Sequence, residues 1–215
     1  MVRIIEQDNY SVALDLARRT FAAQDPAEQA RRTGCRLVGE PEPDRLVVEV
    51  RYLDLTCRVT HPEGHVSIAG SQEALPDWEQ ILVLHYLVST GKVPAPDDPI
   101  IFSQVPSGAF YEAAFQRRVK NHFLSLFGRT PELLLPAAER LGGGKHEGVT
   151  GDIGVRIPAF PRVDLFFILW KADAEFPADV NLLMSSSIAS FLPTEDIAVL
   201  GGIAAGKLIR YARNL

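Results

Sequence analysis

The segment RVDLFFILW, residues 162–170, constrains the fold more than any other part of the chain. Side chains of a strand alternate between its two faces, and here both faces are apolar. One set is Leu165, Phe167 and Leu169, and the other is Phe166, Ile168 and Trp170. A strand of this kind has to lie inside a sheet whose faces are covered. The sequence therefore predicts a sheet packed against helices.

An acidic connection, KADAEFPAD, follows this strand before the apolar run VNLLM resumes. Acidic residues and a proline are typical of a chain that turns in water, so the segment predicts a hairpin connection. Side chains two residues apart in extended chain point the same way, which places Asp173 and Glu175 together. We keep both as candidates for an acid/base pair or for a docking surface for a basic partner.

The remaining elements follow from periodicity and from turn residues. Helices are predicted over 9–32 (broken at Pro26), 75–91, 107–128, 131–144 and from 193 onward, and strands within 45–70, 152–158, 162–170 and 180–186. The first strand region is expected to form three antiparallel strands with turns at 52–54 and 61–64. No repeat or linker divides the chain. These features predict one α+β domain over 1–215, with antiparallel strands in a mixed sheet packed against several helices.

Two of the predicted helices carry candidate residues. The helix over 75–91 is apolar on nearly every face, and its His85 shares a stripe with Trp78 and Ile81. We expect His85 to be buried and neutral, either as a structural histidine, as a general base or as an axial metal ligand. In the helix over 107–128, the residues Tyr111, Phe115, Val119, Phe123 and Leu126 form an apolar stripe. Arg117 lies on the other side, which is typical of a solvated face.

Composition excludes several classes of function. The chain has 22 Lys+Arg against 27 Asp+Glu, a formal net charge of -5, so no nucleic-acid partner is expected. No apolar run reaches the roughly 20 residues of a membrane span, and the first residues do not resemble an export signal, so a cytoplasmic location without membrane contact is expected. Cys35 and Cys57 are far apart and are expected to be small buried residues, without a disulfide or a metal.

Three short motifs are weaker than they look. GGGKHEG, residues 142–148, follows a helix and lacks the ending of a phosphate loop, so it predicts a helix C-cap and a loop. His61 and His65 bracket a turn without a third ligand, which favours a turn over a metal site. The run Ser185 to Ser187 has no nucleophile elbow around it. No catalytic residue is assigned.

Four segments resemble, in order, a bacterial and archaeal family, the domain of unknown function 3786. They are ILVLHYL, FSQVPSGAFYEAAFQRR, FPRVDLFFILWKADAEFPADVNLLM and FLPTEDIAVL, so the resemblance covers most of the chain after about residue 75. Members look typical of anaerobes, and some carry an added four-cysteine iron–sulfur segment, which the two cysteines here do not provide. Ser107 stands where the family commonly has glycine, Asp164 where it has proline, and Ala172 where it has glycine. The resemblance implies no activity and no known cofactor.

Three hypotheses for function follow. The first is a binding or accessory module for redox or cofactor-handling proteins of anaerobes, with a protein partner or a small-molecule ligand. The second is a small-molecule enzyme that uses His85 with Asp173 or Glu175. The third is a tetrapyrrole or corrinoid binder with His85 as the metal ligand, in a pocket lined by Tyr86, Phe110 and Tyr111. The candidate binding residues are His85, Tyr86, Phe110, Tyr111, Arg117, Asp173 and Glu175.

Two motifs give local predictions. PSGAFY, residues 106–111, is expected to lead into a helix and to lie close to the HYL segment, because small residues allow close approach. FLPTED, residues 191–196, is expected to be a structural helix start and not a catalytic carboxylate pair. In that reading Thr194 caps free N–H groups, and Glu195 and Asp196 interact favourably with the helix dipole.

Overall fold

The computed structural model describes residues 2–39, 46–91, 98–148 and 150–215, with side chains from residue 10 onward. The fold is α+β, as predicted, and all the strand pairs described are antiparallel. The described chain forms two compact units. One comprises Met1–Val93 with Ser190–Leu192, and the other comprises Pro94–Ala189 with Pro193–Leu215. The organisation of 1–215 as a single domain stays a prediction.

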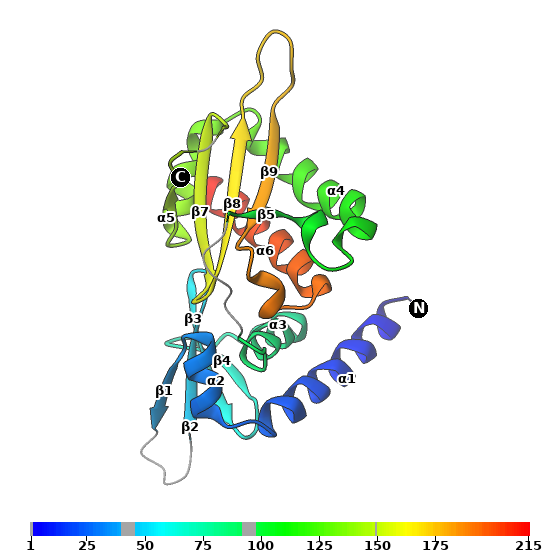
Figure 1. The fold of residues 1–215 in the computed structure, drawn as a ribbon, viewed down its shortest axis with the longest axis vertical. Helices are drawn as coiled ribbons and strands as arrows, with labels where there is room; N and C mark the ends of the chain where they lie inside the picture. Colours follow the sequence, from blue (N-terminus) through cyan, green and yellow to red (C-terminus); the bar gives the residue numbers. More distant parts are fainter. Residues whose placement is uncertain (1, 40–45, 92–97, 149) are drawn as a thin grey trace. The chain divides into compact units, whose positions relative to one another are not determined.

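The first unit combines three helices with a four-stranded sheet (Figure 1). Its elements are α1 (Val2–Ala22), α2 (Pro26–Thr33), β1 (Arg36–Gly39), β2 (Leu46–Tyr52), β3 (Leu55–His61), β4 (Val66–Ile68) and α3 (Asp77–Leu87). The strand order is β1-β2-β3-β4. Helices α1 and α2 and the three antiparallel strands β2, β3 and β4 confirm the predictions. Strand β1 was missed because its four residues show no alternation of apolar and polar side chains.

The change of apolar phase between β2 and β3 is explained by a tight turn. Tyr52 pairs with Leu55, and Leu53 between them has a positive φ of 53°. The turn brings Val50 opposite Cys57, so the two phases meet on one buried face. Cys57 is buried as predicted, whereas Cys35, which follows the glycine that ends α2, is only half-buried.

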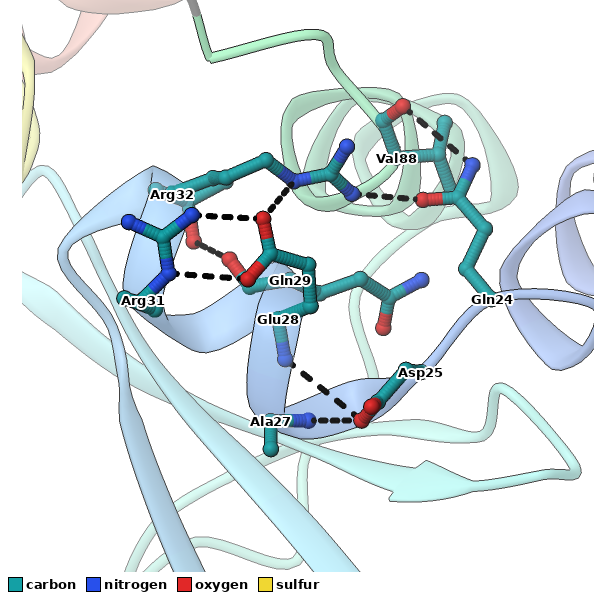
Figure 2. Close-up of polar contacts among 9 residues, drawn as sticks. Gln24, Asp25, Ala27, Glu28, Gln29, Arg31, Arg32 and Val88 are labelled. Carbon is teal, nitrogen blue, oxygen red and sulfur yellow. Dashed lines mark hydrogen bonds and ion pairs between the residues drawn. The ribbon is translucent and has the colours of Figure 1, made fainter.

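A polar cluster ties the connection between α1 and α2 to the end of α3 (Figure 2). The Asp25 carboxylate accepts hydrogen bonds from the N–H groups of Ala27 and Glu28 at the start of α2, at 2.8 and 3.5 Å. Gln24 bridges two elements, because its amide donates to the Val88 carbonyl and accepts from the Arg32 guanidinium at 2.8 Å. Polar side chains therefore replace the intrahelical partners that these helix ends lack.

Tyr52 gives the first unit a predicted response to alkali. Its side chain is fully buried, so burial first, and then the charge of Glu79, raise its pKa well above the usual 10. The unfolded chain loses this proton near pH 10 while the folded chain keeps it, so the free energy of unfolding decreases as pH rises beyond that point. We expect a decrease of about 1.4 kcal/mol per pH unit, up to the folded-state pKa.

Urea unfolding at several alkaline pH values, with circular dichroism as the readout, measures this slope. Tyr52→Phe has no phenol to titrate, so its slope should be smaller by the amount assigned to Tyr52. Equal slopes in the two proteins would contradict this prediction.

The second unit is built on a five-stranded sheet in the order β5-β9-β8-β7-β6 (Figure 1). Its elements are β5 (Ile100–Ile101), η1 (Phe102–Gln104), α4 (Gly108–Phe127), η2 (Pro131–Leu133), α5 (Leu134–Arg140), β6 (Gly144–Lys145), β7 (Ile153–Phe160), β8 (Val163–Trp170), β9 (Asp179–Met184) and α6 (Thr194–Ala212). A short turn, η3 (Ile188–Ser190), lies where the chain passes into the first unit's last segment. Strand β8 is central and buried along most of its length, which confirms the prediction from its two apolar faces.

Helices α4 and α6 pack their buried residues into the core that the sheet strands of this unit also form. Phe123 of α4 stacks on Phe167 of β8, with ring centroids 5.1 Å apart. On α6, a Cβ added at Gly201 would lie 2.9 Å from Leu182 of β9, so glycine allows this helix to approach the sheet closely. The connection between β8 and β9 extends beyond the end of the sheet (Figure 1).

Candidate functional site

The seven candidate residues are divided between the two units. His85 and Tyr86 belong to the first unit, and Phe110, Tyr111, Arg117, Asp173 and Glu175 belong to the second. The pairing of His85 with Asp173 or Glu175 stays a prediction for this reason. The proximity of the PSGAFY and HYL segments also stays a prediction.

His85 and Tyr86 differ from the expectation in opposite ways. His85 is half-buried, not buried. It lies two helical turns after Trp78, on the same side of α3, and Trp78 is 37% exposed, so this side of the helix is near solvent. Tyr86 is fully buried, and its hydroxyl donates to the Thr33 carbonyl at 2.6 Å. Its ring also stacks on Phe191. Tyr86 therefore belongs to the core and does not line an open pocket, which corrects its role in the tetrapyrrole hypothesis.

The candidates on α4 are all exposed. Phe110 is 89% exposed and Tyr111 is 56% exposed, although the apolar stripe predicted that Tyr111 would pack in the core. The reason is that Phe102 of η1 occupies this part of the core and stacks on Phe115 at 4.1 Å. Arg117 lies on the solvated side of α4, as predicted.

The acidic connection is a turn closed by Asp173. Its carboxylate Oδ1 accepts hydrogen bonds from the N–H groups of Glu175 at 2.8 Å and Phe176 at 2.7 Å. These two backbone donors hold the pKa of Asp173 below its usual value. The predicted hairpin connection between β8 and β9 is confirmed, and the Glu175 side chain is exposed beyond it.

A pocket of about 820 Å³ lies at the base of this connection, and we call it the hairpin pocket. It is lined by Lys120, Asp152, Trp170, Lys171, Asp173, Phe176, Pro177, Ala178, Asp179 and Asn181. These residues come from α4, from the chain before β7, from both strands of the β8–β9 hairpin and from the connection between those strands. Only Asp173 among them was a candidate from the sequence.

An ion pair and backbone hydrogen bonds hold the polar wall of the hairpin pocket. Asp179 Oδ1 lies 2.5 Å from the Lys120 ammonium and also accepts a hydrogen bond from the Val180 N–H at 2.8 Å. Across the pocket, Asp152 Oδ2 accepts a hydrogen bond from the Lys171 N–H at 2.7 Å. Each of these carboxylates keeps further acceptor positions, because an ionised carboxylate has about four.

Aromatic side chains provide the apolar part of the hairpin pocket. Trp170 is half-buried at the end of β8, and Phe176 is 67% exposed on the connection. The pocket also has two lysines against three aspartates, a net formal charge of −1. This arrangement can stack on a flat ring and accept hydrogen bonds at the ring's edge. In the described ranges, no three His, Cys, Asp or Glu side chains form a group that could hold a metal ion.

The comparison with family models covers most of the chain. The model described as Domain of unknown function (DUF3786) matches residues 25–207. The chain belongs to this family. The match extends the resemblance read from the sequence toward the N-terminus, because it begins at Asp25, the residue that caps α2. No curated protein and no solved structure matches this DUF3786 chain.

The three departures from the DUF3786 pattern have different surroundings. Ser107 has a positive φ of 60°, a conformation that favours the glycine common in the family. Asp164 forms an ion pair with Arg156 at 2.8 Å, and its N–H donates to Ser185 Oγ at 2.9 Å, a bond that the family's proline cannot make. Ala172 is exposed at the start of the acidic connection.

The glycine run of GGGKHEG follows the end of α5, as predicted. The predicted loop is wrong in part, because Gly144 and Lys145 form the short strand β6 and pair with β7. Gly142 has a φ of 70°, and the Gly143 N–H donates to the Ala138 carbonyl of α5 at 2.9 Å. The two turn histidines show no shared site: His61 Nε2 lies 3.1 Å from the Gln24 carbonyl, and His65 is exposed. Among the described residues, no helix combines the length and apolar character that a membrane span requires.

FLPTED is a helix start, as predicted, but one residue acts differently. Helix α6 begins at Thr194 with Glu195 and Asp196 in its first turn. The Thr194 hydroxyl donates to the Pro106 carbonyl at 2.6 Å, so it does not cap the helix N–H groups as expected. This bond ties the start of α6 to the segment that leads into α4.

Proposed function

We propose that this DUF3786 chain is a binding module whose hairpin pocket takes a small organic molecule with a flat ring and polar edges. The observation that carries the proposal is the hairpin pocket itself. Its volume of about 820 Å³ falls within the range of small-molecule sites, which is about 300–1,000 Å³. Its walls combine aromatic surface with carboxylates, and the family segment around the β8–β9 hairpin supplies most of them.

The charge of the hairpin pocket indicates which ligands it favours. A net formal charge of −1 favours a neutral or cationic ring system over a phosphorylated one. Trp170 offers a flat surface for the ring, and Asp152 and Asp179 offer acceptors for amino or amide N–H groups. The ligand class is thus a heteroaromatic compound that carries hydrogen-bond donors.

The cellular role that we propose is accessory. The module would serve redox or cofactor-handling proteins of anaerobes in the cytoplasm, in keeping with the family resemblance and with the lack of a catalytic motif in the sequence. The proposal concerns binding and assigns no reaction.

Tryptophan fluorescence tests the proposal directly. The chain has two tryptophans, so Trp78→Phe leaves Trp170 as the single reporter inside the hairpin pocket. Adenosine, riboflavin and thiamine serve as probes of neutral and cationic ring systems, and calorimetry checks each titration. We expect saturable quenching by at least one probe. It should weaken in Asp179→Asn and persist in Arg117→Gln, a matched control on the solvated side of α4.

Variants of Asp173 test the proposal more specifically, because the Asp173 carboxylate organises the pocket wall. Asp173→Ala removes the acceptor for two N–H groups, so the turn should loosen and probe binding should weaken; Asp173→Asn keeps an acceptor oxygen and should bind nearly as well. Because the folded-state pKa is lowered, the carboxylate supports the turn above its usual pKa of about 4 and loses this role as the pH falls through the lowered value. Non-saturable quenching by all three probes, with calorimetry showing no heat, would argue against this ligand class.

A further inference from the structure

A second, smaller cavity lies between helices, away from the β8–β9 connection. It has a volume of about 200 Å³ and is formed by η1, α4 and α6 of the second unit; we call it the helix pocket. Its floor consists of Phe102 and Phe115, which are almost fully buried and stacked at 4.1 Å. Tyr111 and Ala114 line one side. The helix pocket is therefore a small apolar hole that is open to solvent.

An exposed aromatic side chain stands next to this hole. Phe110 is 89% exposed and lies four residues before Ala114, so the two share a face of α4 one turn apart. A single exposed apolar residue is common, but here the ring lies beside an apolar hollow, and aromatic side chains are enriched in protein interfaces. Phe110 and the helix pocket therefore form one surface patch, which presents a projecting ring and a hole.

The rim of the helix pocket carries two opposite charges. Arg118 of α4 and Glu195 of α6 both line the pocket and are both exposed. Although they share this rim, no ion pair within 4 Å joins either of them to another side chain in the described part of the chain. The patch therefore offers one positive and one negative group for contacts with another molecule.

We propose that two copies of this chain form a two-fold symmetric dimer in which each Phe110 inserts into the helix pocket of the other copy. A two-fold contact requires a self-complementary surface, and this patch carries both the ring and the hole. The sizes agree, because a buried apolar cavity of about 150 Å³ is enough to hold a benzene ring. In this dimer, Arg118 of one protomer pairs with Glu195 of its partner, and the pair occurs twice.

The second copy is favoured over a different protein by this complementarity. A different partner would have to supply its own ring and would leave Phe110 exposed unless it also supplied a hole. A second copy satisfies the ring, the hole and both charges at once. The proposal does not depend on the ligand of the hairpin pocket, so either idea can fail without the other.

Sedimentation equilibrium of the full chain over a concentration series tests the proposal. We expect the mass of two copies for the wild-type chain and of one copy for Phe110→Asp. Loss of one interface anchor weakens binding roughly 30-fold. A symmetric dimer of the variant loses two such anchors, so the dissociation constant should rise by about 1,000-fold. Phe110 is exposed, so the variant should keep the thermal unfolding midpoint of a folded monomer.

Two matched variants sharpen this result. Phe176→Asp also replaces an exposed phenylalanine of the second unit, but outside the patch, so it should remain a dimer. Ala114→Trp places a large side chain at the mouth of the helix pocket and should give a monomer although Phe110 is intact. Dissociation by Phe176→Asp, or a dimer that persists in Ala114→Trp, would overturn the proposed contact.

A charge exchange tests the orientation of the two copies. Arg118→Glu and Glu195→Arg should each weaken the dimer, because like charges then face each other. A mixture of the two variants should form a heterodimer, in which each contact again joins opposite charges. A wild-type chain that is monomeric throughout the concentration range would overturn the proposal. A heterologous protein that binds this patch while the wild-type chain stays monomeric would do the same.

Discussion

Replacing Phe123 with alanine is expected to lower the free energy of unfolding of the second unit by about 3–5 kcal/mol. The ring is fully buried between α4 and β8, where it stacks on Phe167 at 5.1 Å and contacts Phe127 at 4.5 Å between ring centroids. Its removal leaves a cavity that the packed rings cannot fill without moving. Tyr111→Ala, on the same sequence stripe, should change the free energy by less than about 0.5 kcal/mol because that side chain is exposed.

The measurement requires a probe in the second unit. In a Trp78→Phe background, Trp170 alone reports urea unfolding, and circular dichroism of the whole chain serves as the comparison. If the two readouts give separate transitions, the loss for Phe123→Ala should appear in the Trp170 transition. A loss of equal size for both variants would contradict the assignment of Phe123 to the core and Tyr111 to the surface.

The contrast between Phe123 and Tyr111 shows what a helical stripe can predict. Period and composition identified the side of α4 that packs, and Phe115, Val119 and Phe123 confirm it. They cannot show how far the core extends along the helix. That limit depends on Phe102, which comes from a separate turn and occupies the space that Tyr111 was expected to fill.

The hairpin pocket likewise combines features that the local sequence predicts with features that it does not. The strands, their connection and the turn role of Asp173 follow from local chemistry, and antiparallel register places Asp179 opposite Trp170. Lys120 and Asp152 were not candidates, because they reach the pocket from α4 and from the chain before β7. Nothing in their local sequence indicates these neighbours. A pocket made by several elements depends on how those elements pack.

In the first unit, the apolar character of α3 correctly predicted a central helix, yet it overestimated the burial of His85. A helix that is apolar all round still has one side nearest to solvent, and His85 lies on that side with Trp78. The functional hypotheses that relied on a buried His85 lose this support. Two of its neighbours along α3, Leu84 and Tyr86, are fully buried.

Ser107→Gly and Gly108→Ala should have opposite effects although the residues are adjacent. Ser107 has a φ of 60°, which costs a residue with a side chain roughly 1–2 kcal/mol. Glycine removes this strain but raises the conformational entropy of the unfolded chain, which offsets part of the gain. Ser107→Gly should therefore raise the free energy of unfolding by about 0.5–1 kcal/mol. This expectation agrees with the glycine that the DUF3786 pattern commonly has there.

Gly108→Ala should lower the free energy of unfolding by about 3 kcal/mol. A Cβ at Gly108 would overlap the Phe102 carbonyl oxygen and lie 2.7 Å from Val105 Cγ2, and the backbone atoms around it cannot move without displacing η1. Gly206→Ala is the matched control within α6, where no atom lies within 4 Å of the added methyl group. That variant should gain about 0.5–1 kcal/mol from helix propensity. Urea unfolding followed through Trp170 compares the three variants, and a Gly108→Ala chain as stable as Gly206→Ala would show that η1 does not pack tightly against the start of α4.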